Sequence, residues 1–201
     1  MTEDEIEDCR WQLLYRAEYS TRYHRRRAAF LNNLDTLFTL VTAVAGASAF
    51  GDLVAGSPGW LSKVGAATVT ILSLVQAMLR LGPAGMTHAQ WLKRWSRLHT
   101  SISLATAPTV EQLRSWTEER ASLEEECVAE LRALVLDCED AAARTMSIPG
   151  RQHRITRAQR LLIHFGTFQQ DFPYVADHSR TPAVTALSPT TPSAIEPTEE
   201  R

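Results

Sequence analysis

The residues with the clearest capacity for chemistry are polar side chains inside two long apolar stretches. Within each stretch they recur at the spacing of one helix face. Polar groups in such a position hydrogen-bond two neighbouring helices or, in an assembly of several chains, line a water-filled path for ions. They are Asn32, Asp35, Thr39, Thr42 and Gly46 in the first stretch and Ser73, Gln76 and Arg80 in the second.

Asp35 is the most informative of these residues, because a lone carboxylate is costly in hydrocarbon. The penalty is about 2.5–3.5 kcal/mol at the centre of a bilayer and smaller near its edge. We therefore expect Asp35 to have a partner or a surrounding of water. Arg80 is within reach if the chain turns back near Ala55.

Two interpretations of the polar residues are open. In the structural one, they help two helices to pack closely through a ridge of small residues. In the functional one, several copies assemble with the polar residues around a central axis, since two helices alone cannot enclose a channel. A pore therefore requires a homo-oligomer. The ridge consists of Thr39, Ala43, Ala47 and Gly51.

No catalytic or cofactor-binding motif accompanies these residues. The sequence has no phosphate-binding glycine loop, no nucleophile elbow and no His-Glu-x-x-His. His88 and His99 can share a helix face, but their spacing is too wide for one metal ion. Cys9, Cys127 and Cys138 are scattered, so we expect reduced thiols. We expect no enzyme activity, no cofactor and no metal site.

Two candidate transmembrane helices position the polar residues. The first covers residues 28–51 and the second 59–81, and each is long enough to cross about 30 Å of hydrocarbon. A short outer loop over 52–58 joins them into a hairpin. Pro58 favours a helix start there, and Gly82-Pro83 favours a helix end.

The alternative is a soluble bundle in which both apolar stretches are core helices. A soluble bundle helix carries a charged outer face. Between Thr36 and Gly51 there is no charge on any face. The membrane hairpin is therefore the favoured prediction.

Basic residues lie on the outer edges of the hairpin and predict its orientation. Lys and Arg are retained on the cytoplasmic side of short flanking segments. Both termini are therefore expected in the cytosol, with the chain in the inner (cytoplasmic) membrane. The basic residues expected at the membrane interface are Arg22, Arg25, Arg26, Arg27, Lys93, Arg94 and Arg97.

The remaining segments predict a cytosolic helical bundle. Residues 1–27 form an N-terminal helix that leads into the first span, and residues 84–145 form further helices. A capping box at Thr109 and Gln112 starts a long helix that continues to about Thr145. The predicted fold class is an all-α membrane protein, a two-helix transmembrane hairpin with a cytosolic helical bundle. The helix before the capping box has an apolar side of Trp91, Trp95, Leu98 and Ile102.

Two C-terminal segments differ in composition from the bundle. Residues 150–170 read as a basic amphipathic segment that covers the bundle, lies on an anionic leaflet or docks a phosphate-bearing ligand. Residues 177–201 are rich in Pro, Thr, Ser and Ala, so we expect a disordered tail. The net charge of -2 and the absence of a nucleic-acid-reading motif argue against a nucleic-acid partner.

The arginine- and tyrosine-rich segment from Tyr15 to His24, the two spans and the helix over 91–104 resemble the SLATT family of bacterial two-transmembrane effectors. The likeness covers roughly residues 10–145 and lies in the order of segments. It implies an effector of bacterial conflict and defence systems that permeabilises the membrane through pores. It also implies a nucleotide-synthesising or nucleotide-sensing partner protein.

Two functions from different classes follow as expectations. The leading one is a homo-oligomeric membrane effector, held closed by its cytosolic helices until a signal arrives, after which it forms a permeabilising pore. The alternative is a non-conducting two-span anchor or scaffold that recruits a cytosolic partner. The lipid bilayer is the common partner of both.

Overall fold

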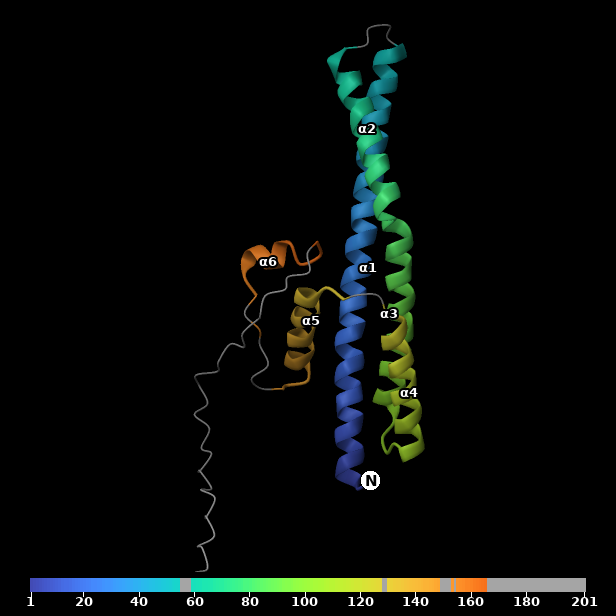
Figure 1. Ribbon diagram of the computed structural model, residues 1–201, viewed down its shortest axis with the longest axis vertical. Coiled ribbons are helices and arrows are strands. Elements are labelled where there is room, and N and C mark those ends of the chain that lie inside the picture. Colours follow the sequence, from blue (N-terminus) through green and yellow to red (C-terminus); the bar gives the residue numbers. More distant parts are fainter. Residues whose placement is uncertain (55–58, 128–129, 149–152, 154, 166–201) are drawn as a thin grey trace, which may run out of the picture.

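The computed structural model describes residues 1–54, 59–127, 130–148, 153 and 155–165, and the regular elements within these ranges are all helices. The predicted all-α class is confirmed for this part of the chain. The order along the chain is α1 (Glu3–Val54), α2 (Trp60–Leu79), α3 (Leu81–Leu104), α4 (Val110–Glu126), α5 (Arg132–Thr145) and α6 (Arg157–Leu161) (Figure 1).

Three predicted segments lie wholly or partly outside the described residues. The loop predicted over 52–58 is described only to Val54, and the tail predicted over 177–201 is not described. Of the basic segment predicted over 150–170, the described part contains the short α6. A capping box of Thr156 and Gln159 starts that helix.

α1 is a single unbroken helix of 52 residues, which corresponds to a length of about 78 Å. Thr2 caps its start: the Thr2 hydroxyl accepts from the Glu5 amide at 3.3 Å, and the Glu5 carboxylate accepts from the Thr2 amide at 2.8 Å. No proline occurs between Glu3 and Val54 to interrupt the helix. The N-terminal helix therefore continues into the first apolar stretch, as the sequence predicted.

α2 returns antiparallel to α1, and α3 follows it after one residue in a left-handed conformation (Figure 1). That residue is Arg80, with φ 47° and ψ 45°. The sequence predicted a helix end at Gly82-Pro83, whereas the break comes earlier and α3 runs through both residues. Pro83 is tolerated because the first turn of a helix has no intrahelical acceptor for its amides.

The long helix predicted from Thr109 to Thr145 is two helices in the structure. The capping box is confirmed, since the Thr109 hydroxyl accepts from the Gln112 amide at 3.2 Å. The helix nevertheless stops at Glu126, and α5 starts at Arg132. The break divides one apolar stripe between two packing surfaces on α1, which a straight helix could not reach together.

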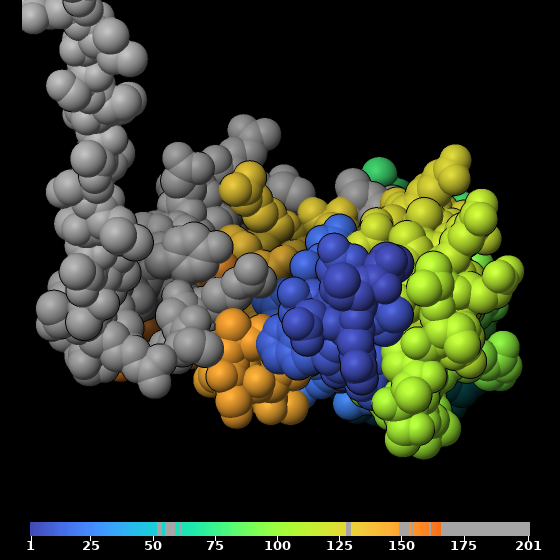
Figure 2. Space-filling model, turned by 90° about the horizontal axis from the view of Figure 1, so that it is seen from below, coloured from blue at the N-terminus to red at the C-terminus, as the bar shows by residue number. Residues whose placement is uncertain are grey.

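These two packing surfaces form separate cores around the lower half of α1. Figure 2 shows the start of α1 between α4 on one side and the α6 region on the other. The predicted apolar side of the helix before the capping box is confirmed as core, with Trp91 partly buried. The first core joins α1, α3 and α4 through Leu13, Ala17, Trp95, Leu98, Ile102, Leu113, Trp116 and Leu123. The second joins α1 to α5 through Tyr19, Tyr23, Ala133, Leu134, Cys138, Ala142 and Ile163.

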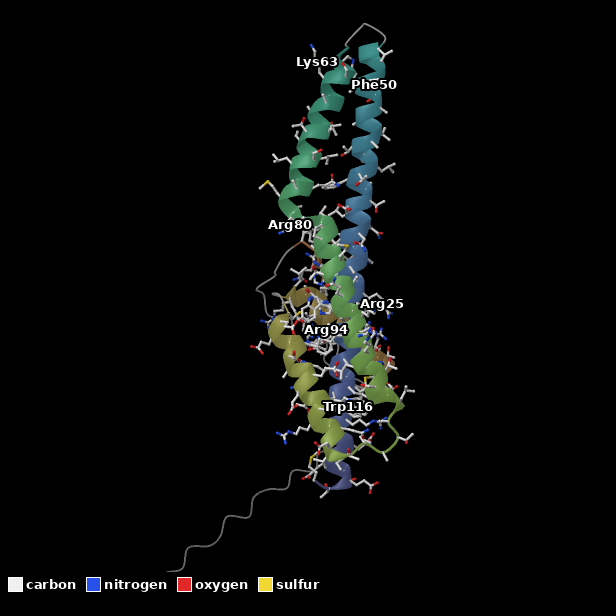
Figure 3. All side chains as sticks on the ribbon, turned by 90° about the vertical axis from the view of Figure 1, so that its right-hand side faces the viewer. Arg25, Phe50, Lys63, Arg80, Arg94 and Trp116 are labelled. Carbon is white, nitrogen blue, oxygen red and sulfur yellow. The ribbon has the colours of Figure 1, made fainter. Side chains whose placement is uncertain are left out.

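The upper half of α1 packs against α2 and, at the level of Asn32 and Asp35, against the start of α3, and both α1 and α2 expose apolar side chains. Two helical stretches are long and apolar enough to cross a membrane. Of the most apolar 18-residue window in each, 0% is buried in the first and 11% in the second. Figure 3 places Phe50 and Lys63 at the free end of this hairpin and Trp116 at the opposite end of the molecule. Exposed residues include Leu37, Leu40, Val44, Phe50, Trp60, Val64, Ile71, Leu74 and Met78.

The left-handed backbone at Arg80 generates a stability prediction. A side chain with a Cβ atom in this conformation costs roughly 1–2 kcal/mol, and glycine avoids that cost. Arg80→Gly should therefore raise the free energy of unfolding in detergent by about 1 kcal/mol. Arg80→Ala is the matched control, because it removes the charge but keeps the Cβ atom. A gain for both variants, or a loss for Arg80→Gly, would contradict the argument.

Candidate functional site

The polar residues of the two apolar helices meet at the lower end of the hairpin. The Gln76 side-chain amide of α2 lies 3.4 Å from the Asp35 backbone carbonyl and 3.5 Å from the Asp35 carboxylate. The same nitrogen lies 3.3 Å from the Thr39 hydroxyl, which itself donates to the Asp35 carbonyl at 2.9 Å. We call Asp35, Thr39 and Gln76 the polar contact. Each bond from Gln76 is long, so the contact is weak and shared among three acceptors.

Two glycines at the start of α3 bring that helix close to the polar contact. A Cβ atom at Gly82 would lie 3.5 Å from the Asp35 carboxylate. A Cβ atom at Gly85 would lie 2.2 Å from the Asn32 side-chain oxygen, which is a clash. Gly85 therefore provides the space for Asn32, and the two helices approach closely at this level.

Arg80 is not the partner of Asp35 in the described part of the chain. Its side chain is exposed, and no ion pair joins it to the Asp35 carboxylate. Figure 3 shows Arg80 at the junction of α2 and α3, between the free end of the hairpin and Arg25. The left-handed turn at Arg80 displaces this residue from the helix face that carries Gln76. Ser73 is exposed as well and takes no part in the contact.

Near the free end, the helices pack through small residues. A Cβ atom at Gly65 would lie 2.9 Å from the Ala45 carbonyl and 3.6 Å from the Ala49 side chain. A Cβ atom at Gly46 would lie 4.0 Å from a methyl group of Val69. Thr42 contributes a buried hydroxyl oxygen that has no hydrogen-bond partner among the residues the structure describes.

The ridge predicted to pack the two helices faces outward along most of its length. Thr39, Ala43, Ala47 and Gly51 are all exposed, and nothing lies within 4 Å of a Cβ atom built at Gly51. α1 instead packs against α2 through neighbouring positions, which include Ala45, Gly46 and Ala49. The sequence therefore has small residues on two sides of α1. Which side packs against α2 depends on the register of α2, which the sequence does not give.

Several of the basic residues predicted at a membrane interface form ion pairs or hydrogen bonds within the helical bundle. Arg22 contacts Glu18 at 2.6 Å. Arg26 pairs with Asp137 of α5. Arg27 donates to the His164 backbone carbonyl at 2.6 Å. Arg26 and Arg27 join α1 to neighbouring segments, whereas the Arg22–Glu18 pair lies within α1. Part-exposed ion pairs of this kind are worth only about 0–1 kcal/mol each.

Of the three basic residues of α3 predicted at the interface, one forms an ion pair and two are exposed. Arg94 pairs with Glu126 of α4 at 2.7 Å. Lys93 and Arg97 are exposed, as is Arg25 on α1, and none of the three forms an ion pair in the described part of the chain. Lys93 lies twelve residues beyond Leu81, a rise of about 18 Å along α3. These basic residues therefore lie at several different distances from the apolar hairpin, measured along the helices.

A buried histidine pair lies just below the polar contact, between α1 and α3. The Nδ1 atoms of His24 and His88 are 3.0 Å apart, and the His24 side chain has no exposed surface. The His24 Nε2 atom lies 3.8 Å from the Cys127 sulfur, and the Trp91 ring stacks on the His24 ring. Burial lowers the pKa of His24 to about 3 and that of His88 to about 4. Both imidazoles are therefore neutral at pH 7.

Sequence reasoning missed this pair. His24 and His88 are 64 residues apart, and only the antiparallel register of α1 and α3 brings them together. The pattern suggested His88 and His99 on one helix face, but His99 contacts Glu18 at 3.3 Å instead. No signal in the sequence gives the register of α3 against α1, so the pair could not be found from the sequence alone.

The cysteines and histidines offer little for catalysis or metal binding in the described residues. No group of three or more metal-ligating side chains occurs there. Burial raises the pKa of the Cys138 thiol to about 12 and also raises that of Cys127. Thiols with raised pKa values hold little thiolate at pH 7 and are poor nucleophiles.

Comparison of the chain with protein-family models, with curated proteins and with solved structures finds no match. The function must therefore be argued from the residues and their geometry.

The close approach at Gly85 generates a prediction about stability. Gly85→Ala places a Cβ atom against the end of the Asn32 side chain, which must turn away, so we expect a small decrease in the free energy of unfolding, of about 1 kcal/mol. Gly51→Ala is the matched control, because open space surrounds Gly51 and alanine favours a helix. Thermal unfolding in detergent measures both. Asn32→Ala should rescue Gly85→Ala, and an undiminished loss in the double variant would refute the contact.

The histidine pair generates a prediction about pH. Unfolded histidines bind protons below about pH 6.5, whereas His24 and His88 stay neutral in the folded chain down to about pH 3 and 4. The unfolded state then binds more protons, so stability should fall as the pH falls from 6.5 to 4. Denaturant unfolding at each pH measures the slope.

The double variant His24→Gln, His88→Gln should flatten this slope. His164 keeps a residual slope, because burial also lowers its pKa to about 4. An unchanged slope in the double variant would show that the pair does not titrate in this way.

Proposed function

We propose that this chain is an integral membrane protein whose α1–α2 hairpin crosses a bilayer. The exposure of the apolar hairpin is the observation that carries the proposal. A core helix of a soluble bundle buries its apolar face, whereas the most apolar window of α1 is 0% buried. Leu40, Val44 and Met78 are at least 60% exposed, as lipid-facing side chains would be.

The length of the uncharged hairpin suits this role. Thr36–Gly51 and Val64–Leu79 are free of charge, and each stretch of sixteen residues rises about 24 Å. Lys63 marks one border, and Asp35 and Arg80 mark the other. The hydrocarbon core is about 30 Å thick, so Lys63 and Arg80 extend outward to reach the headgroups.

Two threonine hydroxyls of α2 are satisfied within that helix. Thr68 donates to the Val64 carbonyl at 2.8 Å, and Thr70 donates to the Ala66 carbonyl at 2.9 Å. Such bonds let a hydroxyl face lipid without an unsatisfied donor. The outward surface of the hairpin is therefore suited to hydrocarbon despite its threonines.

The orientation follows from the basic residues. Because Lys and Arg are retained in the cytosol, α3 to α6 and the start of α1 lie on the cytosolic side of the inner membrane. Phe30 stacks on His164 at 4.2 Å between ring centroids. Through that contact the cytosolic module covers α1 at Phe30. The inner border of the bilayer therefore lies between Phe30 and the uncharged stretch that begins at Thr36.

Within this frame, the chain acts as a membrane effector that forms a homo-oligomeric pore on activation. The outward ridge of Thr39, Ala43, Ala47 and Gly51 is suited to close contact with a second copy. Rearrangement would release the weak polar contact at Asp35 toward a water-filled axis. The resemblance to SLATT proteins adds a role in bacterial defence and a nucleotide-synthesising or nucleotide-sensing partner.

One observation favours the second candidate, a non-conducting anchor or scaffold. In the single chain, the Gln76 amide already contacts Asp35 and Thr39, so the polar residues join two helices. An anchor needs nothing further from them. The effector requires this contact to open, and the two functions therefore differ in an observable transition.

Two measurements separate the candidates. Fractionation of cells should place the full chain in the membrane fraction, and recovery in the soluble fraction without detergent would refute both membrane functions. Induced expression in bacteria with a membrane-potential dye should show depolarisation for an effector. An anchor should leave the potential unchanged under every condition tested.

Substitution of Asp35 tests its place in the conducting path. Asp35→Leu should abolish conductance without preventing membrane insertion, because it removes the charge that faces the axis and lowers the cost of burial. Thr36→Val is the matched control, since Thr36 is exposed outside the polar contact. Conductance is measured with purified protein in planar bilayers. Full conductance in Asp35→Leu would rule out a lining role.

A further inference from the structure

A short segment beside α1, residues 155–165, lies close to the inner border of the membrane hairpin. It contains α6, and Figure 1 shows α6 closer to the hairpin than α5 is. Ile163 is buried in the second core, and Ile155 packs against the same core. The packing of both isoleucines therefore holds the segment at this level.

Contacts with α1 fix the end of this segment beside Phe30. The His164 ring stacks on the Phe30 ring, and the Phe165 ring meets Phe30 edge-on with 5.1 Å between ring centroids. The Arg27 guanidinium donates to the His164 backbone carbonyl at 2.6 Å. Phe165 therefore lies at the level of Phe30, which is five residues before Asp35 on α1.

The level of Phe30 corresponds to the headgroup layer of a bilayer. Phe30 lies six residues before Thr36, where the uncharged stretch of α1 begins, a rise of about 9 Å. Hydrocarbon about 30 Å thick, centred on an uncharged stretch of about 24 Å, extends about 3 Å beyond each end of it. The headgroup layer adds roughly 5–8 Å on each side. Phe30 and its ring partners are therefore about 6 Å below the hydrocarbon, inside that layer.

The segment exposes two large apolar side chains at this level. Leu162 is 52% exposed and Phe165 is 65% exposed. One turn carries both, because the Phe165 amide donates to the Leu162 carbonyl at 2.9 Å. Leucine and phenylalanine are typical of the side chains that surface-bound helices insert at the boundary between headgroups and acyl chains.

Basic side chains accompany the apolar pair. Arg157 is exposed and forms no ion pair among the residues that the structure describes. The Arg160 side chain is 69% exposed and lies 3.8 Å from the Asp137 carboxylate, which already pairs with Arg26. Such an exposed and shared ion pair is weak. Both guanidinium groups of α6 are therefore available to an anionic partner.

We propose that residues 155–165 bind the cytosolic leaflet of the membrane through anionic phospholipids. Leu162 and Phe165 enter the boundary between headgroups and acyl chains, and Arg157 and Arg160 bind lipid phosphates. The positive charge favours anionic lipid over zwitterionic lipid, and the apolar pair favours a leaflet over a free phosphate ion. This contact rests on insertion of the hairpin and adds a second membrane attachment to it.

The hairpin makes this second attachment possible with few contacts. A short segment with two apolar and two basic side chains binds a membrane only weakly by itself. Here α1 already holds the segment at the membrane surface, so its binding is an intramolecular step at high effective concentration. The anionic lipid content of the leaflet then controls whether the α5 and α6 side of the molecule is attached.

The test measures the depth of a nitroxide spin label on the full-length chain in lipid nanodiscs. Cys9, Cys127 and Cys138 are replaced by alanine, and one exposed position at a time is changed to cysteine and labelled. Ala158→Cys reports on α6, because the Leu162 amide donates to the Ala158 carbonyl and the two residues share a helix face. The label's collision rates with oxygen and with a water-soluble nickel chelate give its depth.

Two further positions make failure of this contact distinguishable from failure of hairpin insertion. Leu40→Cys lies on the exposed face of the hairpin, and Ala121→Cys lies on the exposed surface of α4. The nanodiscs contain phosphatidylcholine alone or with roughly 30% phosphatidylglycerol, which is anionic.

In anionic nanodiscs, the ratio of oxygen to nickel collisions should be about threefold higher at position 158 than at position 121. The ratio at 158 should fall at least about twofold in phosphatidylcholine alone and in the variant Arg157→Gln. Arg114→Gln is the matched control, because it removes an exposed arginine from α4 and should leave the ratio unchanged.

Equal ratios at 158 and 121 in anionic nanodiscs, with the label at 40 in hydrocarbon, would overturn the leaflet contact alone. A ratio at 158 that is the same in both lipid compositions would overturn the role of anionic lipid. A label at 40 that is accessible to the nickel chelate would instead refute insertion of the hairpin.

Discussion

The whole structure depends on the continuity of α1. One helix runs through the helical bundle and the apolar hairpin, and α2, α3, α4 and α5 all pack against it. Because α1 has no proline and no internal break, it continues as one helix through both halves of the molecule, which therefore share its axis (Figure 1). The upper half has an apolar outer surface, and the lower half has two buried cores.

The register of the antiparallel partner is the second constraint. Small residues determine how near α2 and α3 approach α1: Gly65 at the free end, Gly82 and Gly85 at the polar contact. The positions of α2 and α3 along α1 in turn bring together the residues of the polar contact and the two histidines of the pair. The buried imidazoles, neutral at pH 7, complete the packing without a charge.

Much of the fold could be predicted from local signals. Thr109 and Gln112 placed the start of α4, and the apolar periodicity placed Trp95 and Leu98 in a core. The absence of charge between Thr36 and Gly51 indicated a helix without a polar outer face. Each of these signals lies within a few residues of what it determines, so one sequence was sufficient.

The remainder depended on contacts between distant segments. Nothing near Glu126 signals the end of α4, because the break serves packing on two sides of α1. Arg80 is a poor residue for a left-handed turn, so the sequence pointed to Gly82-Pro83 instead. The partners of Arg26 and Arg94 lie on α5 and α4, and the charge pattern alone did not distinguish ion pairs from a basic membrane surface.

The left-handed backbone at Arg80 also has a mechanical consequence. α2 and α3 are rigid rods that share a joint one residue long, and α3 extends 24 residues beyond it. A rotation of about 10° at that joint carries the far end of α3 by roughly 6 Å over its 36 Å length. Because Trp95, Leu98 and Ile102 of α3 are buried against α1 and α4, the core resists such a rotation, and packing along α1 fixes the angle between α2 and α3.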